Sequence, residues 1–352
     1  MEKQGLAVIA TGMVCALGNS SKTVAAITDA GISAYRTSPV LNRRNKAIVM
    51  AQLPEGALPA LPPEFIALKQ TKPGHTFMVQ MAAAALLDCL SESARKHPLP
   101  LFMACPELLP GKKSRLESTF LNDLKQLSQC NIDLTCSHRV HTGRAGGLDV
   151  LELAYRYFEA TGAEFALLGG VDSFRHFDSQ ISFLDKQKRL LAEDVNDGFA
   201  IGEGASFVLL ASPSAYKKYA LTAKLFLGRP AITREEGHRY SDNIYRGDGL
   251  AQAFKQALQE CPNLPINSIY GSLNGESFGA KEYGVARIRS SQRLAEKAIL
   301  HHPAEYFGDI GAATAPMLFS LIAHNEKKPC LVYCSSDGAA RGAVCVWQPE
   351  YS

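Results

Sequence analysis

Short apolar runs and longer amphipathic segments alternate along the chain. In the first half, the apolar runs have the length of buried strands and lie at 6–10, 101–104, 165–168 and 199–210. Helical periodicity occupies segments between them, at 22–30, 77–92, 115–129 and 147–161. The segment 35–72, which is rich in proline, is expected to be mostly loop. Alternating strands and helices predict an α/β protein whose parallel sheets are covered by helices.

The same alternation begins again near residue 218. Strands are predicted at 221–226, 267–273, 330–334 and 342–347, and helices at 249–260, 281–299 and 311–323. The length of 352 residues exceeds the roughly 250 to 300 residues that one simple core supports. We therefore predict two structurally similar halves, 1–215 and 216–352, although no strong sequence repeat relates them.

Composition and charge exclude several classes of protein. The 37 Lys and Arg residues nearly balance the 34 Asp and Glu residues, and the basic residues are scattered, so no surface for nucleic acid is expected. No run reaches the roughly 18 uncharged apolar residues of a spanning helix. The apolar stretch 6–18 is interrupted by Thr11 and Gly12, which favours a buried first strand over a signal peptide.

The nine cysteines predict neither a metal site nor a redox motif. They are an odd number, lie mostly in apolar runs and form no CxxC pair. We interpret them as reduced thiols in the core of a cytoplasmic protein. No metal and no cofactor are expected.

Four segments carry specific motifs in a fixed order. Residues 9–19 read IATGMVCALGN, 167–172 read LLGGVD, 197–205 read DGFAIGEGA and 308–313 read GDIGAA. In this order they resemble motifs of the β-ketoacyl-acyl-carrier-protein synthases of the thiolase superfamily, and the similarity extends over nearly the whole chain. The resemblance implies a thiolase fold, in which two fused βαβαβ-type halves form an α-β-α-β-α layered architecture.

The resemblance also implies where catalytic residues would lie. Members of that family use a nucleophilic cysteine at a helix N-terminus and two histidines that stabilise an enolate. In this chain the cysteine position, 26 residues before Gly170, holds Arg144. The two histidine positions hold Glu276 and Asp309. An arginine cannot accept an acyl group because its guanidinium stays protonated, so no catalytic residue is predicted at these positions.

Arginine and two carboxylates suggest a new role for the pocket. An arginine fork held by Glu276 and Asp309 would fill it with ion pairs. Alternatively, the pocket binds an anionic ligand at a helix N-terminus. Cys136 imitates the nucleophile motif, with His138 nearby, but it lies 34 residues before Gly170 instead of 26.

These substitutions predict a catalytically inactive pseudoenzyme that binds a protein as an accessory or scaffold subunit. The resemblance implies a homodimer, or a heterodimer with a related synthase, formed through a strand within 130–143. A protein client is a further possibility, including an adaptor role beside type VI secretion effectors. The alternatives are a residual acyl-transfer enzyme that uses Glu276 or Asp309 as a base, and an acyl-binding or acyl-carrier-protein-binding module.

Overall fold

One mixed sheet forms the framework of the protein. The computed structural model describes residues 5–261, 266–326 and 329–351. The sheet has eleven strands, ten of them in the order β12-β11-β13-β14-β9-β1-β8-β6-β4-β5, with β10 paired to β14. Their bounds are β1 Leu6–Cys15, β4 Leu101–Ala104, β5 His138–Val140, β6 Phe165–Asp172, β8 Gly204–Ala211, β9 Leu225–Leu227, β10 Ala231–Arg234, β11 Ile266–Gly271, β12 Leu294–His301, β13 Cys330–Ser335 and β14 Ala340–Trp347. The short strand β9 pairs with β1 on one side and with β14 on the other, and so joins the two arms of the sheet.

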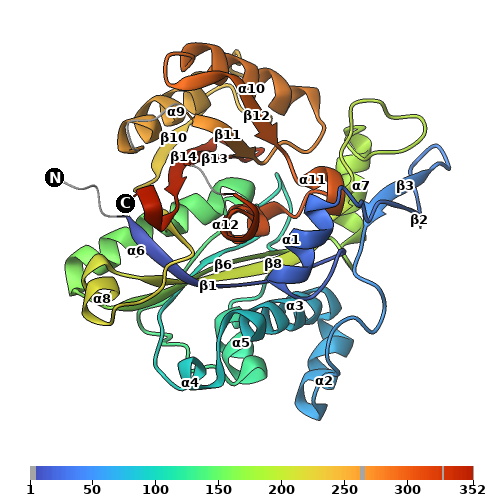
Figure 1. The fold of residues 1–352 in the computed structure, drawn as a ribbon. Coiled ribbons are helices and arrows are strands. Elements are labelled where there is room, and N and C mark those ends of the chain that lie inside the picture. Colours follow the sequence, from blue (N-terminus) through green and yellow to red (C-terminus); the bar gives the residue numbers. More distant parts are fainter. Residues whose placement is uncertain (1–4, 262–265, 327–328, 352) are drawn as a thin grey trace.

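The helices and the two arms of the sheet form five layers, with helices on both outer sides and between the arms (Figure 1). Helix α3 (Pro73–Cys89) packs on β1 and β8 on one outer side, and α5 (Phe120–Ser128) packs against α3. Helices α9 (Asp248–Glu260) and α10 (Ser277–Arg289) cover the opposite outer side. Between the arms lie α6 (Gly146–Thr161) and α12 (Thr314–Asn325). The order is helix, sheet, helix, sheet, helix, as the resemblance implies.

The two central helices are packed closely at their N-terminal ends. The first nine residues of α12, from Thr314 to Ile322, are all buried. Gly147 in the first turn of α6 leaves no room for a side chain, because a Cβ there would lie 2.6 Å from the Cβ of Ala315. Both helices are preceded by a single 3₁₀ turn, Gly143–Ala145 before α6 and Gly311–Ala313 before α12. This packing brings the loops that carry Arg144 and Asp309 together.

Several predicted elements have the predicted bounds or nearly so. Strand β4 occupies 101–104 as predicted, and helix α1 (Ser21–Asp29) begins after Ser20, whose hydroxyl accepts a hydrogen bond from the backbone N–H of Thr23. The expectation of purely parallel sheets is wrong. Strands β4, β5 and β6 are parallel to one another, but β8 runs antiparallel to both β1 and β6.

Two segments differ from their predicted structure. The helix predicted at 281–299 ends at Arg289, and β12 pairs with β11 instead, because tertiary pairing overrides a weak helical preference. The segment 35–72 contains β2 (Arg36–Leu41), β3 (Ala47–Ala51) and α2 (Pro63–Thr71). Strand β2 tolerates Pro39 because it is an edge strand.

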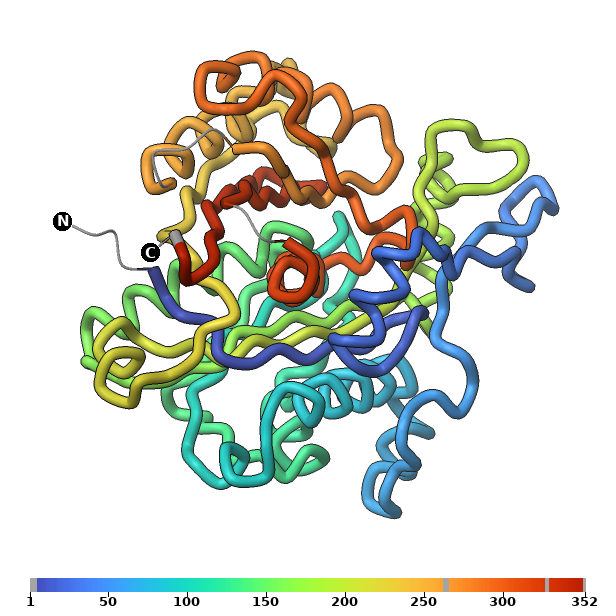
Figure 2. Tube along the Cα trace, in the orientation of Figure 1, coloured from blue at the N-terminus to red at the C-terminus, as the bar shows by residue number. Residues whose placement is uncertain are grey.

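A small second sheet lies beside the main one. It has the order β2-β3-β7, with β7 at Ile201–Gly202, and the backbone N–H of Val49 donates to the carbonyl of Leu191 at 2.8 Å. Figure 2 shows the β2–β3 hairpin and the loop after α7 (Asp178–Lys186) side by side. The remaining short helices are α4 (Glu92–Arg95), α8 (Pro213–Lys218), α11 (Ala304–Phe307) and a final turn at Pro349–Tyr351. The predicted division between 215 and 216 falls inside α8, and it stays a prediction.

The interpretation of all nine cysteines as reduced thiols is wrong for two of them. Cys261, at the end of α9, and Cys345, in β14, form a disulfide. The sequence does not indicate this disulfide, because the two cysteines are 84 residues apart and meet only when α9 packs on β14. Cys15, Cys89, Cys105, Cys130, Cys330 and Cys334 are buried thiols, as predicted, and Cys136 is half-buried.

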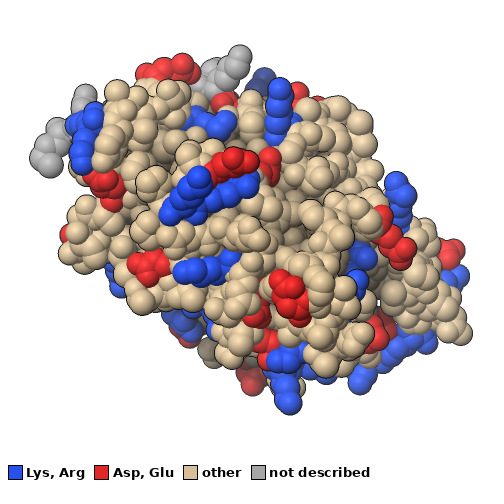
Figure 3. Space-filling model, turned by 90° about the horizontal axis from the view of Figure 1, so that it is seen from below, with Lys and Arg blue, Asp and Glu red and all other residues tan. Residues whose placement is uncertain are grey.

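The surface agrees with the nearly balanced charge. On the face seen in Figure 3, Lys and Arg side chains are interspersed with Asp and Glu. Within the described ranges, no helix is both long enough and apolar enough to cross a membrane.

Candidate functional site

Arg144 lies at the N-terminal end of the central helix α6. It belongs to the 3₁₀ turn that leads into this helix, and its side chain is 13% exposed. The turn starts at Gly143, whose φ of +63° favours glycine and where a Cβ would contact Glu107. A cation is unfavourable at a helix N-terminus, since the helix dipole is positive there. Arg144 therefore needs carboxylates close by.

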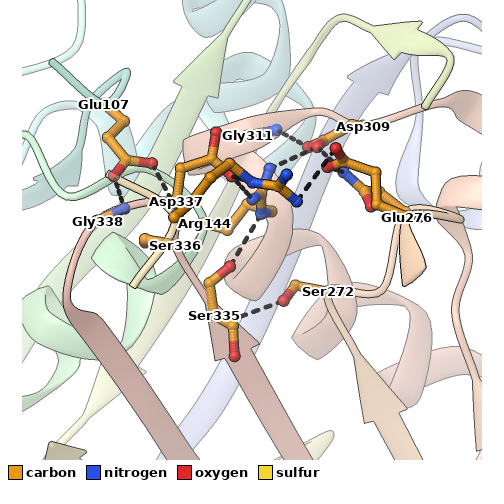
Figure 4. Close-up of polar contacts among 12 residues, drawn as sticks. Glu107, Arg144, Ser272, Glu276, Asp309, Gly311, Ser335, Ser336, Asp337 and Gly338 are labelled. Carbon is orange, nitrogen blue, oxygen red and sulfur yellow. Dashed lines mark hydrogen bonds and ion pairs between the residues drawn. The ribbon is translucent and has the colours of Figure 1, made fainter. Parts of the chain in front are cut away.

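Two carboxylates and a carbonyl bind the Arg144 guanidinium (Figure 4). Its two terminal nitrogens donate to Oδ2 of Asp309 at 2.6 Å and to Oδ1 of Asp337 at 2.5 Å. Its Nε donates to the carbonyl of Ser335 at 2.9 Å. Burial lowers the pKa of Arg144, but Asp309 and Asp337 outweigh burial and raise this pKa well above its ordinary value. The arginine is charged at every pH at which the protein folds.

Glu276 does not bind Arg144, contrary to the expectation from sequence. It is the residue before α10, and both of its oxygens accept hydrogen bonds at 2.8 Å from Arg189. Arg239 also pairs with Glu276, at 3.1 Å. Burial lowers the pKa of Arg189, but Asp337 and Glu276 raise it above its ordinary value. The structure thus assigns Glu276 to a second arginine that the sequence analysis missed.

Asp337 connects the two arginines. This residue lies in the loop between β13 and β14, and its carboxylate accepts hydrogen bonds from Arg144, from Arg189 at 2.6 and 3.0 Å, and from the hydroxyl of Tyr240 at 3.1 Å. Burial raises the pKa of Asp337, but the charges of Arg144 and Arg189 hold it far below its ordinary value. Asp337 is the bridge of the site, and it too was missed.

Together these groups form a charge-balanced cluster. We call it the ionic network and define it by three arginines and three carboxylates: Arg144, Arg189, Arg239, Glu276, Asp309 and Asp337. The sequence suggested one arginine and two carboxylates, Arg144, Glu276 and Asp309, and these three side chains alone have a net negative charge. Adding Arg189, Arg239 and Asp337 gives three positive and three negative charges, a sum of zero. A signal for them would have been the requirement that buried carboxylates be paired.

Asn274 and Gly311 complete the shell of Asp309. The Asn274 amide donates to Oδ2 of Asp309 at 2.8 Å and to Glu276 at 3.1 Å. The backbone N–H of Gly311 donates to Oδ1 of Asp309 at 2.9 Å. Asp309 is therefore held by Arg144, Asn274 and the turn before α12. Its oxygens have partners on both sides, which leaves little capacity to accept a proton from a substrate.

Glu107 supports the loop that carries Asp337. Its carboxylate accepts hydrogen bonds from the backbone N–H groups of Asp337 at 3.1 Å and of Gly338 at 2.6 Å. Burial, followed by the nearby charge of Asp337, raises the pKa of Glu107 to about 7. This carboxyl therefore changes its charge near neutral pH.

The space around the ionic network is small. Three cavities border it, with volumes of about 20, 10 and 30 Å³. Each has room for about one or two water molecules. None has the size of an acyl chain, and in the described ranges no group of His, Cys, Asp and Glu side chains is arranged to hold a metal ion.

The segment 197–205, which we call the signature segment, packs against the start of α10 and against the loop before Asp309. Asp197 accepts hydrogen bonds from the backbone N–H of Ser277 at 2.6 Å and from its hydroxyl at 2.7 Å, at the start of α10. Gly202 packs against the loop before Asp309, where a Cβ would lie 2.3 Å from the carbonyl oxygen of Phe307. Glu203 accepts a hydrogen bond from the backbone N–H of Leu53 at 2.7 Å and pairs with Arg175. Each of these side chains holds backbone in place.

Cys136 lies apart from the ionic network. It precedes β5 in a half-exposed loop, and its thiol lies 3.7 Å from the hydroxyl of Thr135. The ring of His138 stacks on Phe102, with centroids 5.8 Å apart, and does not face this thiol as a base would. The Cys136 side chain also interacts with Asp133 and Tyr157, and neither is a histidine that could act as its base.

Comparison with known proteins identifies the fold. No family model and no curated protein matches the sequence. Among solved structures, a ketosynthase domain of Streptomyces albus oxazolomycin synthesis has a TM-score of 0.78 at 13% identity, over 98% of this chain and 75% of that one. The ishigamide ketosynthase/chain length factor has a TM-score of 0.74 at 13% identity, over 98% and 99%. The Xenorhabdus doucetiae ketosynthase in complex with its chain length factor has a TM-score of 0.71 at 14% identity, over 98% of both chains. The chain has the fold of these ketosynthases, at only 13 to 14% sequence identity.

Proposed function

We propose that this protein is a non-catalytic ketosynthase-fold subunit whose function is to bind another protein. The observation that carries the proposal is the environment of Arg144. The start of the central helix, where the resemblance implies a nucleophile, holds a guanidinium bound by Asp309, Asp337 and the Ser335 carbonyl. A protonated guanidinium cannot attack a thioester.

The two alternative functions have less support. A residual enzyme that used Glu276 or Asp309 as a base would need a free oxygen beside an open space, and both carboxylates are engaged by arginines. An acyl-binding module at this site would need a pocket of acyl width, and the cavities at the network are only the size of one or two water molecules. The charge balance likewise disfavours capture of an anionic ligand at Arg144.

Partner binding is the role that the retained fold supports. Ketosynthase folds occur in complexes of two related chains, as in the ketosynthase and chain length factor of Xenorhabdus doucetiae. In this protein β5 is the terminal strand of the sheet and lies inside 130–143, the segment expected to form a dimer. An adaptor role beside type VI secretion effectors has no structural feature of its own and stays a prediction.

Acyl loading tests the proposal. The protein is incubated with acyl-CoA and with acyl-loaded carrier protein, and its intact mass is then measured, with an active ketosynthase as a positive control. We expect the positive control to gain the acyl mass and this protein to remain unchanged. A stoichiometric adduct on any cysteine would contradict the proposal, and an adduct that disappears in Cys136→Ala would assign the chemistry to Cys136.

A further inference from the structure

A large cleft lies far from the ionic network. Its volume is about 690 Å³, which is within the range of pockets that bind small molecules. Strands β4 and β6 begin beside it, with Leu99 and Phe165 in its wall, and α4 and the residue after α8, Tyr219, form its sides (Figure 1). Arg144 precedes α6, whereas Tyr157, which lines the cleft, lies about 20 Å further along this helix. The cleft is therefore separate from the site described above.

Most of the cleft wall consists of apolar, proline and aromatic residues. The rings of Phe165 and Tyr219 stack with their centroids 6.0 Å apart, and Tyr219 is 47% exposed. The ring of Tyr157 is held against the buried Phe102, with centroids 5.5 Å apart. Packed aromatic rings beside an open cleft of this volume suit a ligand with an apolar or aromatic body.

One of the two carboxylates in the cleft already binds a cation of the chain. Glu164 accepts hydrogen bonds from Nζ of Lys218 at 2.7 Å and from the hydroxyl of Tyr219 at 2.9 Å. The Lys218 ammonium also lies 4.7 Å from the centroid of the Tyr219 ring. A carboxylate and a tyrosine ring thus hold one ammonium group by an ion pair and a cation–π contact.

The other carboxylate has a tyrosine nearby but no such cation. Asp133 accepts hydrogen bonds from the backbone N–H of Thr135 at 3.0 Å and from its hydroxyl at 2.6 Å. Burial raises the pKa of Tyr157, and the charge of Asp133 adds to this rise, so the two side chains lie within electrostatic reach. Among the described residues no Lys or Arg pairs with Asp133, and Lys125 donates instead to the carbonyl of Ile132 at 2.8 Å. Asp133 therefore leaves a negative charge beside an aromatic ring.

We propose that this cleft binds a small organic cation, an amine with an aromatic or branched apolar body. The ammonium group lies at Asp133 and Tyr157, in the way that Lys218 lies at Glu164. The body lies against the apolar wall. Charge selects the class of ligand, because an anion would meet two carboxylates and a neutral molecule would gain only the apolar contact. This binding site goes beyond the proposed function, since it needs neither the ionic network nor a second chain.

Three probes with the same indole body and different charges test the proposal. Near pH 7 tryptamine is a cation, tryptophol is neutral and indole-3-propionate is an anion. We expect tryptamine to bind with a dissociation constant of about 1 mM or lower in isothermal titration calorimetry. Indole-3-propionate should bind at least about tenfold more weakly, and salt should weaken the binding of tryptamine but not that of tryptophol.

Substitutions in the cleft separate the ion pair from the apolar contact. Asp133→Asn keeps the Oδ1 acceptor for Thr135 but removes the charge, so tryptamine should bind about three- to tenfold more weakly and tryptophol as before. Tyr219→Ala should weaken both probes about threefold or more, whereas Tyr219→Phe, which keeps the ring, should bind both as wild type does. Asp242→Asn is the matched control, because it removes one exposed charge in the loop between β10 and α9, where no residue lines the cleft.

Several results would overturn the proposal. One is equal affinity for tryptamine and indole-3-propionate, and another is no detectable binding of tryptamine up to about 10 mM. Tryptamine binding that is unchanged in both Asp133→Asn and Tyr219→Ala, each folded by circular dichroism, would place the amine elsewhere. A dimer that Tyr219→Ala converts to a monomer would mean that the cleft holds a second copy of the chain instead. None of these results bears on acyl loading, so failure of this inference is distinguishable from failure of the proposed function.

Discussion

The signature segment lies next to the ionic network, but only the signature segment has a sequence that resembles the family motif. The segment 197–205 keeps the motif DGFAIGEGA, and its side chains bind backbone: Asp197 holds the start of α10, and Glu203 holds the N–H of Leu53. The network occupies the positions where the resemblance implies cysteine and histidine, and these hold Arg144, Glu276 and Asp309. The segment that resembles a family motif binds backbone, whereas the residues at the positions that the resemblance implies to be catalytic are held in ion pairs.

The contrast explains how a divergent chain keeps the fold. Gly202 has no room for a side chain, so any substitution there displaces the loop that leads to Asp309. At the network, by contrast, the requirement is only that charges balance and hydrogen bonds are satisfied. Three arginines and three carboxylates meet that requirement, but removing one member leaves an unpaired buried charge. Both regions therefore stabilise the fold, and substitutions in either region should lower the free energy of unfolding.

Arg189→Ala should have the largest effect. The substitution removes the hydrogen bonds to both oxygens of Glu276 and to Asp337, and it leaves those carboxylates buried with less compensating charge. We expect the free energy of unfolding to fall by about 3 to 5 kcal/mol in denaturant titrations. The control is Arg156→Ala, which breaks an exposed pair with Glu152 and should cost less than about 0.5 kcal/mol. Equal, small effects of the two would mean that the network does not stabilise the fold.

Gly202→Ala should have the next largest effect, and it tests the signature segment. The new Cβ would overlap the carbonyl oxygen of Phe307, which is backbone and cannot rotate away. We expect a loss of about 2 to 3 kcal/mol in the free energy of unfolding. Gly284→Ala is the control, since nothing lies within 4 Å of a Cβ there and the residue is in α10, where alanine should be neutral or stabilising. Tolerance of Gly202→Ala would remove the structural reason for the motif.

Glu107→Gln should change pH dependence more than stability at one pH. The raised pKa of Glu107, about 7 in the fold against an ordinary value of 4.5, means that the folded state binds the proton more tightly. Its contribution to stability is therefore complete below about pH 4.5 and is lost as pH rises through 7. Glutamine does not titrate and keeps an acceptor oxygen for one of the two N–H groups, that of Asp337 or that of Gly338. Wild type should lose on the order of 1 to 2 kcal/mol more than the variant between pH 5 and pH 8. Parallel curves would contradict this assignment.

The Cys261–Cys345 disulfide determines how many cysteines can be alkylated, and this prediction is independent of the ionic network. Alkylation of the denatured, unreduced protein should modify seven cysteines, because Cys261 and Cys345 are joined, and alkylation after reduction should modify nine. Mass spectrometry reads both numbers directly. Nine modified thiols before reduction would restore the interpretation of fully reduced cysteines made from sequence.

The fold could be predicted from sequence much better than the site. Strand β4 coincides with the short apolar run at 101–104, and the motif at 197–205 has a structural reason, since Gly202 has no room for a side chain and Asp197 binds backbone. The partners of Arg144 were only half predictable. Asp309 lies in a recognisable motif, whereas Asp337 and Arg189 lie in segments with no motif and reach the site only through tertiary packing. The disulfide and β12 were missed for the same reason, since both depend on contacts between distant segments.

The pH dependence of Arg144→Ala is the most direct test of the central claim that Arg144 is part of a buried ion network. Without the guanidinium, Asp309 and Asp337 lose a shared counter-charge, and burial of a carboxylate without that charge favours its protonated form. The folded variant should therefore take up protons more readily than folded wild type does, so its stability relative to wild type falls as pH rises. We predict a loss of about 3 kcal/mol at pH 8 that is partly recovered at pH 5. A melting temperature within about one degree of wild type at every pH from 5 to 8 would contradict the account.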